Sequence, residues 1–184
     1  MSDSIFAHNT KHTGFTLDSL GDVAKWRGGL WEDIPLISYR LMQYSMLSVL
    51  TDEHGLEQAN EYFRRAGHLA GLEFAENTLL LDTDFNTFVF DLQTTLKKLK
   101  IGILHIDSFD PDTYEIACTV CQDCDCGDLP VTNENVRIYD EGFIAGILEA
   151  FTGISYRVRK TNCCCASGVM AYRFSSVSSL DNAP

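Results

Sequence analysis

Hydrophobic positions recur with a helical period through the first half of the chain. Residues 36–50 are apolar on nearly every side of a helix, and Arg40 is their only charged residue. A helix of this kind must be covered on most of its surface, so we expect it to form a dimer interface. A second helix is predicted over 56–81, and a third after Asp84, which is a favourable N-cap residue.

The second predicted helix carries small residues at a spacing of four. They are Ala66, Gly67, Ala70 and Gly71. Small residues let the backbone of another helix come close, so this stripe predicts tight helix packing. Together with the apolar helix over 36–50, it favours a homodimer formed through the N-terminal helices.

The pattern changes from a helical period to strand-like runs after residue 100. Residues 101–109 and 114–120 have the pattern of two strands joined by an Asp-Pro-Asp turn, which predicts an antiparallel hairpin. Two more strands are expected over 154–160 and 170–174, where apolar and polar residues alternate. Because helices come first and a mainly antiparallel sheet follows, the sequence predicts an α+β fold.

One further short helix is predicted between the hairpin and the last two strands. It covers 141–151, with Asp140 as its N-cap and Gly153 as its stop. Gly142 and Gly146 lie one turn apart on it.

Composition divides the chain into a polar start, a central domain and a Ser-rich end. We expect 1–20 to be a flexible N-terminal arm, 21–176 to form a single domain, and 177–184 to be a disordered tail. No apolar run approaches the roughly 18 residues of a membrane span. The first residues also lack the basic start and apolar stretch of a signal peptide, so the sequence predicts a cytoplasmic protein.

Charge and motifs exclude several function classes. The chain has 26 acidic and 14 basic residues, a formal net charge of −12, which argues against a nucleic-acid backbone as partner. It contains no GxSxG, P-loop, dinucleotide-binding or HExxH motif. We therefore expect a protein without catalytic residues rather than an enzyme.

All seven cysteines fall into two clusters. The first has the pattern CxxCxxCxC and the second is three consecutive cysteines: Cys118, Cys121, Cys124, Cys126, Cys163, Cys164 and Cys165. Clustering at short spacings points to thiolate chemistry rather than to packing. In a reducing compartment this favours a metal centre or reactive thiols over a disulfide framework.

Residues 139–174, reading YDEGFIAGILEAFTGISYRVRKTNCCCASGVMAYRF, resemble the C-terminal signature of the 4-vinyl reductase domain family. The apolar helix, AGHLAG and KIGILHID also occupy places where that family has equivalents, so the resemblance covers about 21–174. It implies an α+β fold like that of vesicle-tethering (TRAPP) complex subunits, with a homodimer formed through the N-terminal helices. It also implies a ligand that is a small aromatic molecule or a tetrapyrrole.

The zinc site of sensors in this family is not kept here. Its four positions correspond to Arg137, Thr161, Cys164 and Tyr172 if one residue is inserted before the triple cysteine. Without the insertion they correspond to Arg137, Lys160, Cys163 and Ala171. Either way one thiolate survives, and one thiolate cannot hold a structural zinc ion.

The remaining cysteines could form a different metal site. CxxCxxC resembles part of a bacterial ferredoxin run, so we favour an iron-sulfur cluster over a tetrahedral zinc site. If the sheet brings both clusters to the same end, each needs to supply only one or two ligands. The resemblance implies that the residue at the position of Cys164 binds a metal. The expected ligands are Cys121, Cys124, Cys126 and Cys164, with Cys118, Cys163 and Cys165 as alternates.

Some of these residues also have an ordinary structural interpretation. Cys118 shares a strand face with Ile116 and is also typical of a core residue. His105 is expected to be a hydrogen-bonded core histidine. His68 would be an axial ligand if a tetrapyrrole bound beside the small stripe, but packing is the expected role.

Three functions therefore remain open. The first is a non-enzymatic metal protein that acts as a redox-linked or metal-linked sensor or an assembly factor. The second is a tetrapyrrole-binding or small-aromatic-binding protein, an accessory of (bacterio)chlorophyll biosynthesis or photosystem assembly. The third is a structural tethering subunit without a cofactor.

Overall fold

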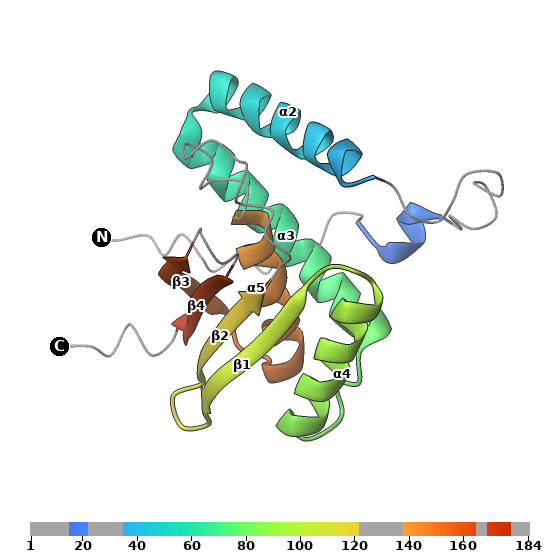
Figure 1. Ribbon diagram of the computed structural model, residues 1–184, viewed down its shortest axis with the longest axis vertical. Helices are drawn as coiled ribbons and strands as arrows, with labels where there is room; N and C mark the ends of the chain where they lie inside the picture. The colour runs from blue at the N-terminus through green and yellow to red at the C-terminus, as the bar shows by residue number, and fades with distance from the viewer. Residues whose placement is uncertain (1–14, 22–34, 122–137, 165–168, 178–184) are drawn as a thin grey trace, which may run out of the picture. The chain divides into compact units, whose positions relative to one another are not determined.

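The computed structural model describes residues 15–21, 35–121, 138–164 and 169–177. Backbone contacts divide the chain into two units, Met1–Asp33 and Ile34–Pro184. In the first unit the described part is a short 3-10 helix, η1 (Leu17–Leu20). The second unit holds the sheet and the longer helices (Figure 1). None of the helices in the described ranges is both long enough and apolar enough to cross a bilayer.

Helices and strands of the second unit follow the predicted order. They are α2 (Leu36–His54), α3 (Leu56–Thr78), α4 (Phe85–Lys98), β1 (Ile103–Asp110), β2 (Glu115–Cys121), α5 (Ile138–Thr152), β3 (Tyr156–Cys164) and β4 (Val169–Ser176). Asp84 caps α4 as predicted, because its side chain accepts hydrogen bonds from the backbone N–H groups of Asn86 and Thr87. Gly153 ends α5 with a φ of 71°, which a residue with a side chain rarely adopts.

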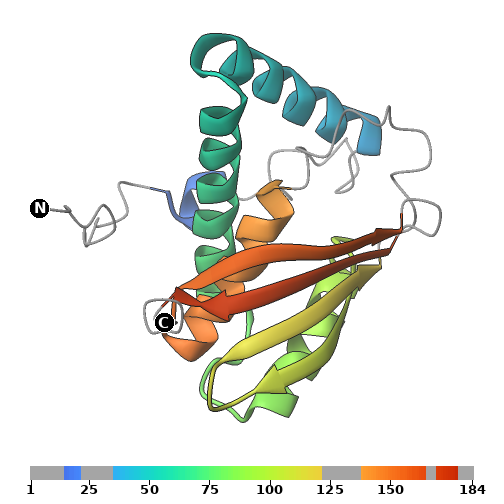
Figure 2. The ribbon, with the colours of Figure 1, turned by 90° about the vertical axis from the view of Figure 1, so that its left-hand side faces the viewer.

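The four strands form one antiparallel sheet in the order β1-β2-β4-β3 (Figure 2). The predicted hairpin is β1 and β2, and the α+β class is confirmed. β3 lies at one edge of this sheet, and β4 is the one described strand that pairs with it. Its pairing with β4 shifts by one residue between Lys160 and Asn162, so Thr161 is an extra residue in a β-bulge.

Several predicted boundaries were wrong: α3 ends at Thr78 rather than at residue 81, β3 runs on to Cys164 rather than ending at residue 160, and α5 and β4 differ as well. α5 begins at Ile138, so Asp140 lies inside its first turn and is not its N-cap. An acidic residue is favourable there as well, because the start of a helix carries partial positive charge. β4 continues past Phe174 to Ser176, which is buried and pairs with Tyr156. Pairing with β3 therefore extends this strand into a Ser-rich segment whose composition suggested an end.

The main core lies between the sheet and the helices α3, α4 and α5. Its largest fully buried side chains include Phe88 and Leu92 from α4, Leu148 from α5, and Ile116 and Phe174 from the sheet. Phe88 stacks on Phe151 of α5, with ring centroids 4.0 Å apart. Aromatic and aliphatic side chains from distant segments thus pack against one another in this core.

α3 and α5 cross with their backbones almost touching. A Cβ atom on Gly67 would lie 2.0 Å from the Tyr139 carbonyl oxygen, and one on Gly142 would lie 2.1 Å from the Arg64 carbonyl oxygen. Those distances are shorter than any real contact, so only glycine fits on both sides of the crossing. The predicted close packing is confirmed, but the neighbouring helix belongs to the same chain. The small stripe therefore does not support a dimer.

α2 packs against α3 through a second, smaller core. Leu47 of α2, Ala59 and Phe63 of α3, and Ile138 at the start of α5 form this cluster. The rest of α2 keeps large apolar side chains in solvent. The most exposed of them are Ile37, Leu41, Met42, Met46 and Val49. The expectation that this helix needs a cover is thus matched by its exposed surface, while the homodimer itself stays a prediction.

Candidate metal centre at the end of the sheet

The register of the sheet brings the last described cysteine of each cluster to the same end. Cys121, the last residue of β2, pairs with Val169 of β4, and Cys164, the last residue of β3, pairs with the same Val169. Neighbouring strands are about 4.8 Å apart, so the Cα atoms of Cys121 and Cys164 lie about 10 Å from each other. Cys163 pairs with Met170, one row further along. The condition set by the sequence, that both clusters reach one end of the sheet, is met for these backbone positions.

The β-bulge in β3 lies where the sequence comparison with the zinc sensors allowed one inserted residue. Thr161 is the extra residue, and it directly precedes Asn162 and the triple cysteine. An insertion at this place is the alternative in which the expected family position falls on Cys164 rather than on Cys163. Tyr172, the position of another family ligand, is buried and pairs with Cys118.

Cys118 is a core residue. Its side chain is fully buried beside Ile116 and Phe174, and it forms no disulfide. Burial, and secondarily the negative charge of Asp107, raises the pKa of the Cys118 thiol to about 12. A thiol in this environment stays protonated at neutral pH and is a poor metal ligand.

Three of the cysteines, Cys124, Cys126 and Cys165, lie outside the described residues. For Cys121, Cys163 and Cys164 the structure describes the backbone alone. Among the side chains that it does describe, no three His, Cys, Asp or Glu are grouped as a metal site would require.

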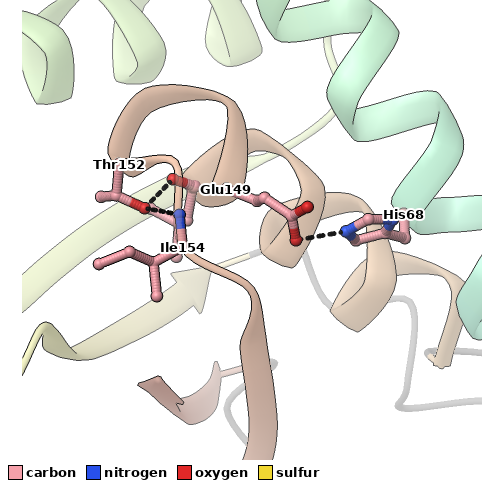
Figure 3. A network of polar contacts seen from close by, with 5 residues as sticks. His68, Glu149, Thr152 and Ile154 are labelled. Atoms are coloured by element: carbon pink, nitrogen blue, oxygen red, sulfur yellow. Dashed lines mark hydrogen bonds and ion pairs between the residues drawn. The ribbon is translucent and has the colours of Figure 1, made fainter. Parts of the chain in front are cut away.

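His68 and Glu149 form a polar pair across the α3–α5 crossing (Figure 3). The Nε2 atom of His68 lies 2.9 Å from Oε2 of Glu149, and both side chains are about one quarter to one third exposed. One turn further along α5, the Thr152 hydroxyl donates to the Leu148 carbonyl at 2.8 Å and accepts from the Ile154 N–H at 3.3 Å. His68 therefore has a hydrogen-bonding role that joins α3 to α5.

The prediction for His105 was wrong. Its side chain is exposed, because alternation along β1 sends its neighbours Leu104 and Ile106 toward the core instead. On the outer face next to it, the hydroxyl of Thr119 donates to Asp107 at 2.7 Å.

A cleft opens where the end of α4 and the start of β1 meet the first turns of α5. Its lining is almost entirely apolar and consists of Leu96, Ile101, Gly102, Leu104, Asp140, Phe143 and Ile144. The space enclosed within the cleft is small, about 30 Å³, and the rest of its opening is continuous with solvent. Asp140 is the one charged residue of this lining, so an apolar guest would meet a carboxylate at one side.

Asp140 also belongs to a polar cluster that the sequence analysis missed. Burial, followed by the negative charge of Asp140 and then Tyr139, raises the pKa of Tyr39 to about 12. The pKa of Tyr139 is raised for the same first two reasons. Tyr39 lies on α2 and is a hundred residues from the other two, so no local pattern could have linked them.

Neither a protein-family model nor a curated protein sequence matches the chain. Solved structures do share its fold. The phenol-responsive sensory domain of the transcription activator PoxR, solved with phenol, is 17% identical with a TM-score of 0.60, and the match covers 75% of this chain and 74% of that one. A vinyl-4-reductase family protein from Methanocaldococcus jannaschii is 14% identical with a TM-score of 0.53, covering 81% and 85%.

A third similar structure is a trafficking protein particle complex subunit 3 from Naegleria fowleri, covalently bound to palmitic acid. It is 14% identical with a TM-score of 0.54, covering 77% of this chain and 96% of the subunit. At these identities the likeness concerns the fold alone. The chain has the α+β fold that the resemblance implied, shared with a vinyl-4-reductase family protein and a trafficking-complex subunit.

Proposed function

We propose that this chain is a non-enzymatic sensor or assembly protein with a thiolate-ligated metal centre at the end of its sheet. The observation that supports the proposal is the shared pairing partner of Cys121 and Cys164, which is Val169. Two cysteines that are distant in sequence thereby lie in one cross-strand row. Cys124 and Cys126 follow Cys121 closely in the chain and are the other proposed ligands. Cys163 and Cys165 are the alternates.

The spacing of the row favours an iron-sulfur cluster over a single zinc ion. Two thiolate sulfurs on one zinc are about 4 Å apart, because each Zn–S bond is about 2.3 Å. A separation of about 10 Å between the Cα atoms of Cys121 and Cys164 leaves both cysteines little freedom to meet at one ion. A cluster of several iron and sulfide ions is wider and is held by thiolates from separate segments.

Anaerobic purification tests this proposal. We expect broad absorption near roughly 400 nm together with iron and acid-labile sulfide in the same sample. Cys121→Ser and Cys164→Ser should each lose most of the iron. Cys118→Ala is the matched control and should retain it, because Cys118 lies in the core. A sample with zinc and no iron would replace the cluster by a zinc site, and a sample with neither metal would refute the metal centre.

A second candidate function is binding of a small apolar molecule in the cleft between α4, β1 and α5. The apolar lining supports it, and so does the phenol-responsive neighbour. Titration with phenol and with protoporphyrin, followed by intrinsic fluorescence, tests it. Ile101→Gln should weaken binding, and Cys164→Ser should leave it intact. Binding that is equal in the Ile101 variant would exclude this cleft.

We also propose that two chains associate through α2. The support is its row of exposed side chains, among which Leu41 is 71% exposed and Met46 53%. Sedimentation should give a dimer at micromolar concentration, and Leu41→Glu should give a monomer. A monomeric unmodified chain would refute the dimer.

A further inference from the structure

Three arginines gather on the outer face of the sheet at its β3 edge. Arg159 of β3 pairs directly with Arg173 of β4, and Arg157 lies two residues before Arg159 on the same strand. Residues paired across antiparallel strands extend to the same face, with Cβ atoms about 5 Å apart. All three side chains are exposed, whereas Val158 and Phe174 between them pack toward the core. The three guanidinium groups therefore lie on one face.

Among the residues that the structure describes, one carboxylate pairs with this cluster. Arg173 donates to Glu115 of β2 at 2.7 Å. Arg157 and Arg159 have neither an ion pair nor a hydrogen bond with any other residue that the structure describes. Like charges placed directly opposite each other destabilise a sheet. Two arginines paired across strands are unexpected in a chain with a net charge of −12, because its acidic residues outnumber its basic ones.

The same strand presents an open edge. β3 is the last strand in the order β1-β2-β4-β3, so one side of its backbone has no neighbour among the described strands. An edge of this kind can accept an added strand, whose main chain supplies hydrogen bonds while alternate side chains contact one face. Arg157 and Arg159 are alternate residues, so acidic residues at alternate positions of an added strand would meet them.

We infer that the β3 edge, with Arg157, Arg159 and Arg173, is a docking surface for an extended acidic segment of a partner protein. The guanidinium group binds carboxylates through two parallel hydrogen bonds, which suits acidic side chains. A nucleic acid could not pair with the open backbone, and the strongly negative chain would repel its phosphates. The rival explanation is that the arginines only keep the edge from pairing with other copies.

Peptide binding separates these explanations. The probe is a short fluorescein-labelled peptide of alternating Glu and Thr, and the reference probe has Gln in place of Glu. Fluorescence anisotropy should show binding of the Glu peptide, weakened by added salt, and much weaker binding of the Gln peptide. The double variant Arg157→Gln/Arg159→Gln should bind the Glu peptide about tenfold more weakly or worse, because charge-assisted hydrogen bonds are lost.

The control variant removes the same charge elsewhere. Lys97→Gln/Lys98→Gln changes two exposed lysines at the end of α4 and should leave peptide binding unchanged. Equal binding of both peptides, no binding of either, or an equal loss in the control would overturn the inference. Binding of anionic phosphatidylglycerol vesicles through the arginines, without binding of the peptide, would also overturn the inference. Increased self-association of the arginine variant with unchanged peptide binding would establish the protective role instead.

Discussion

Gly71 of α3 lies so close to Phe143 of α5 that a Cβ atom on Gly71 would be 2.1 Å from the Phe143 carbonyl oxygen. A backbone oxygen in the middle of a helix cannot move aside as a flexible side chain can. The two helices would have to separate, and α5 also carries Ile147 and Leu148 in the main core. The glycine crossing thus fixes the position of the helix that leads into β3.

Gly71→Ala should therefore destabilise the fold, although alanine normally favours a helix. We expect a loss of about 1–3 kcal/mol from overpacking, measured by urea denaturation. Ala66→Gly, on the exposed side of the same helix, should cost only about 1 kcal/mol through its helix propensity. A Gly71→Ala variant as stable as the unmodified chain would contradict the close crossing.

The thiol of Cys118 should be unreactive in the folded protein. Its pKa of about 12 and its burial keep it protonated and out of reach of reagents. Iodoacetamide at pH 8 should label Cys118 only after denaturation, as located by mass spectrometry of peptides. Because the thiol ionises at a lower pH in the unfolded chain, near 9, its contribution to stability should decline as the pH rises above that value. Rapid labelling of the native protein would show that Cys118 is accessible.

The His68–Glu149 pair should couple α3 to α5 energetically. A double-mutant cycle with His68→Ala and Glu149→Ala should give a coupling free energy of about 0.5–1 kcal/mol, because the partly exposed pair is screened by solvent. The pair Arg64–Glu61 lies within α3 and should give about 0.2–0.5 kcal/mol as a reference. A coupling near zero for His68 and Glu149 would mean that the 2.9 Å contact contributes nothing to stability.

Asp84 should make the stability of the fold depend on acidic pH. Hydrogen bonds from the Thr87 hydroxyl, then from the backbone N–H groups of Thr87 and Asn86, lower the pKa of Asp84 below its ordinary value of 3.8. A lowered pKa in the folded state gives stability that is present above pH 4 or so and is lost as the pH falls through the folded pKa. Asp84→Asn keeps a capping side chain but cannot titrate.

The difference in melting temperature between the unmodified chain and Asp84→Asn should therefore shrink as the pH falls below about 4. Asp82→Asn, at an exposed position before the helix, is the control and should show no comparable change. If this difference stayed constant from about pH 2 to about pH 7, the ionised form of Asp84 would contribute nothing to stability.

Much of the fold follows from local patterns. The cap at Asp84, the Asp-Pro-Asp turn and the hairpin of β1 and β2 each depend on residues a few positions apart, and each was predicted correctly. The boundaries of α5 and β4 were not, because Ile138 and Ser176 are held by packing and pairing with distant segments. His105 failed for a related reason, since alternation alone does not say which face of a strand is covered.

For the candidate site, the cysteine pattern indicated the kind of ligand but not which cysteines lie close together. It placed the cysteines in two clusters and left open whether these meet. The meeting of Cys121 and Cys164 beside Val169 depends on the register of three strands, which side-chain burial across the whole sheet decides.

By itself, the amino-acid sequence determined the order of helices and strands, the α+β class and the residues available for metal chemistry. Tertiary structure alone decided that the small stripe of α3 receives α5 of the same chain, that Cys118 is buried in the core, and that Arg159 faces Arg173. The physical reason is the separation along the chain over which each interaction acts. Caps, turns and periodicity act over a few residues, whereas helix crossings and strand register are set by the packing of segments that are distant in the chain.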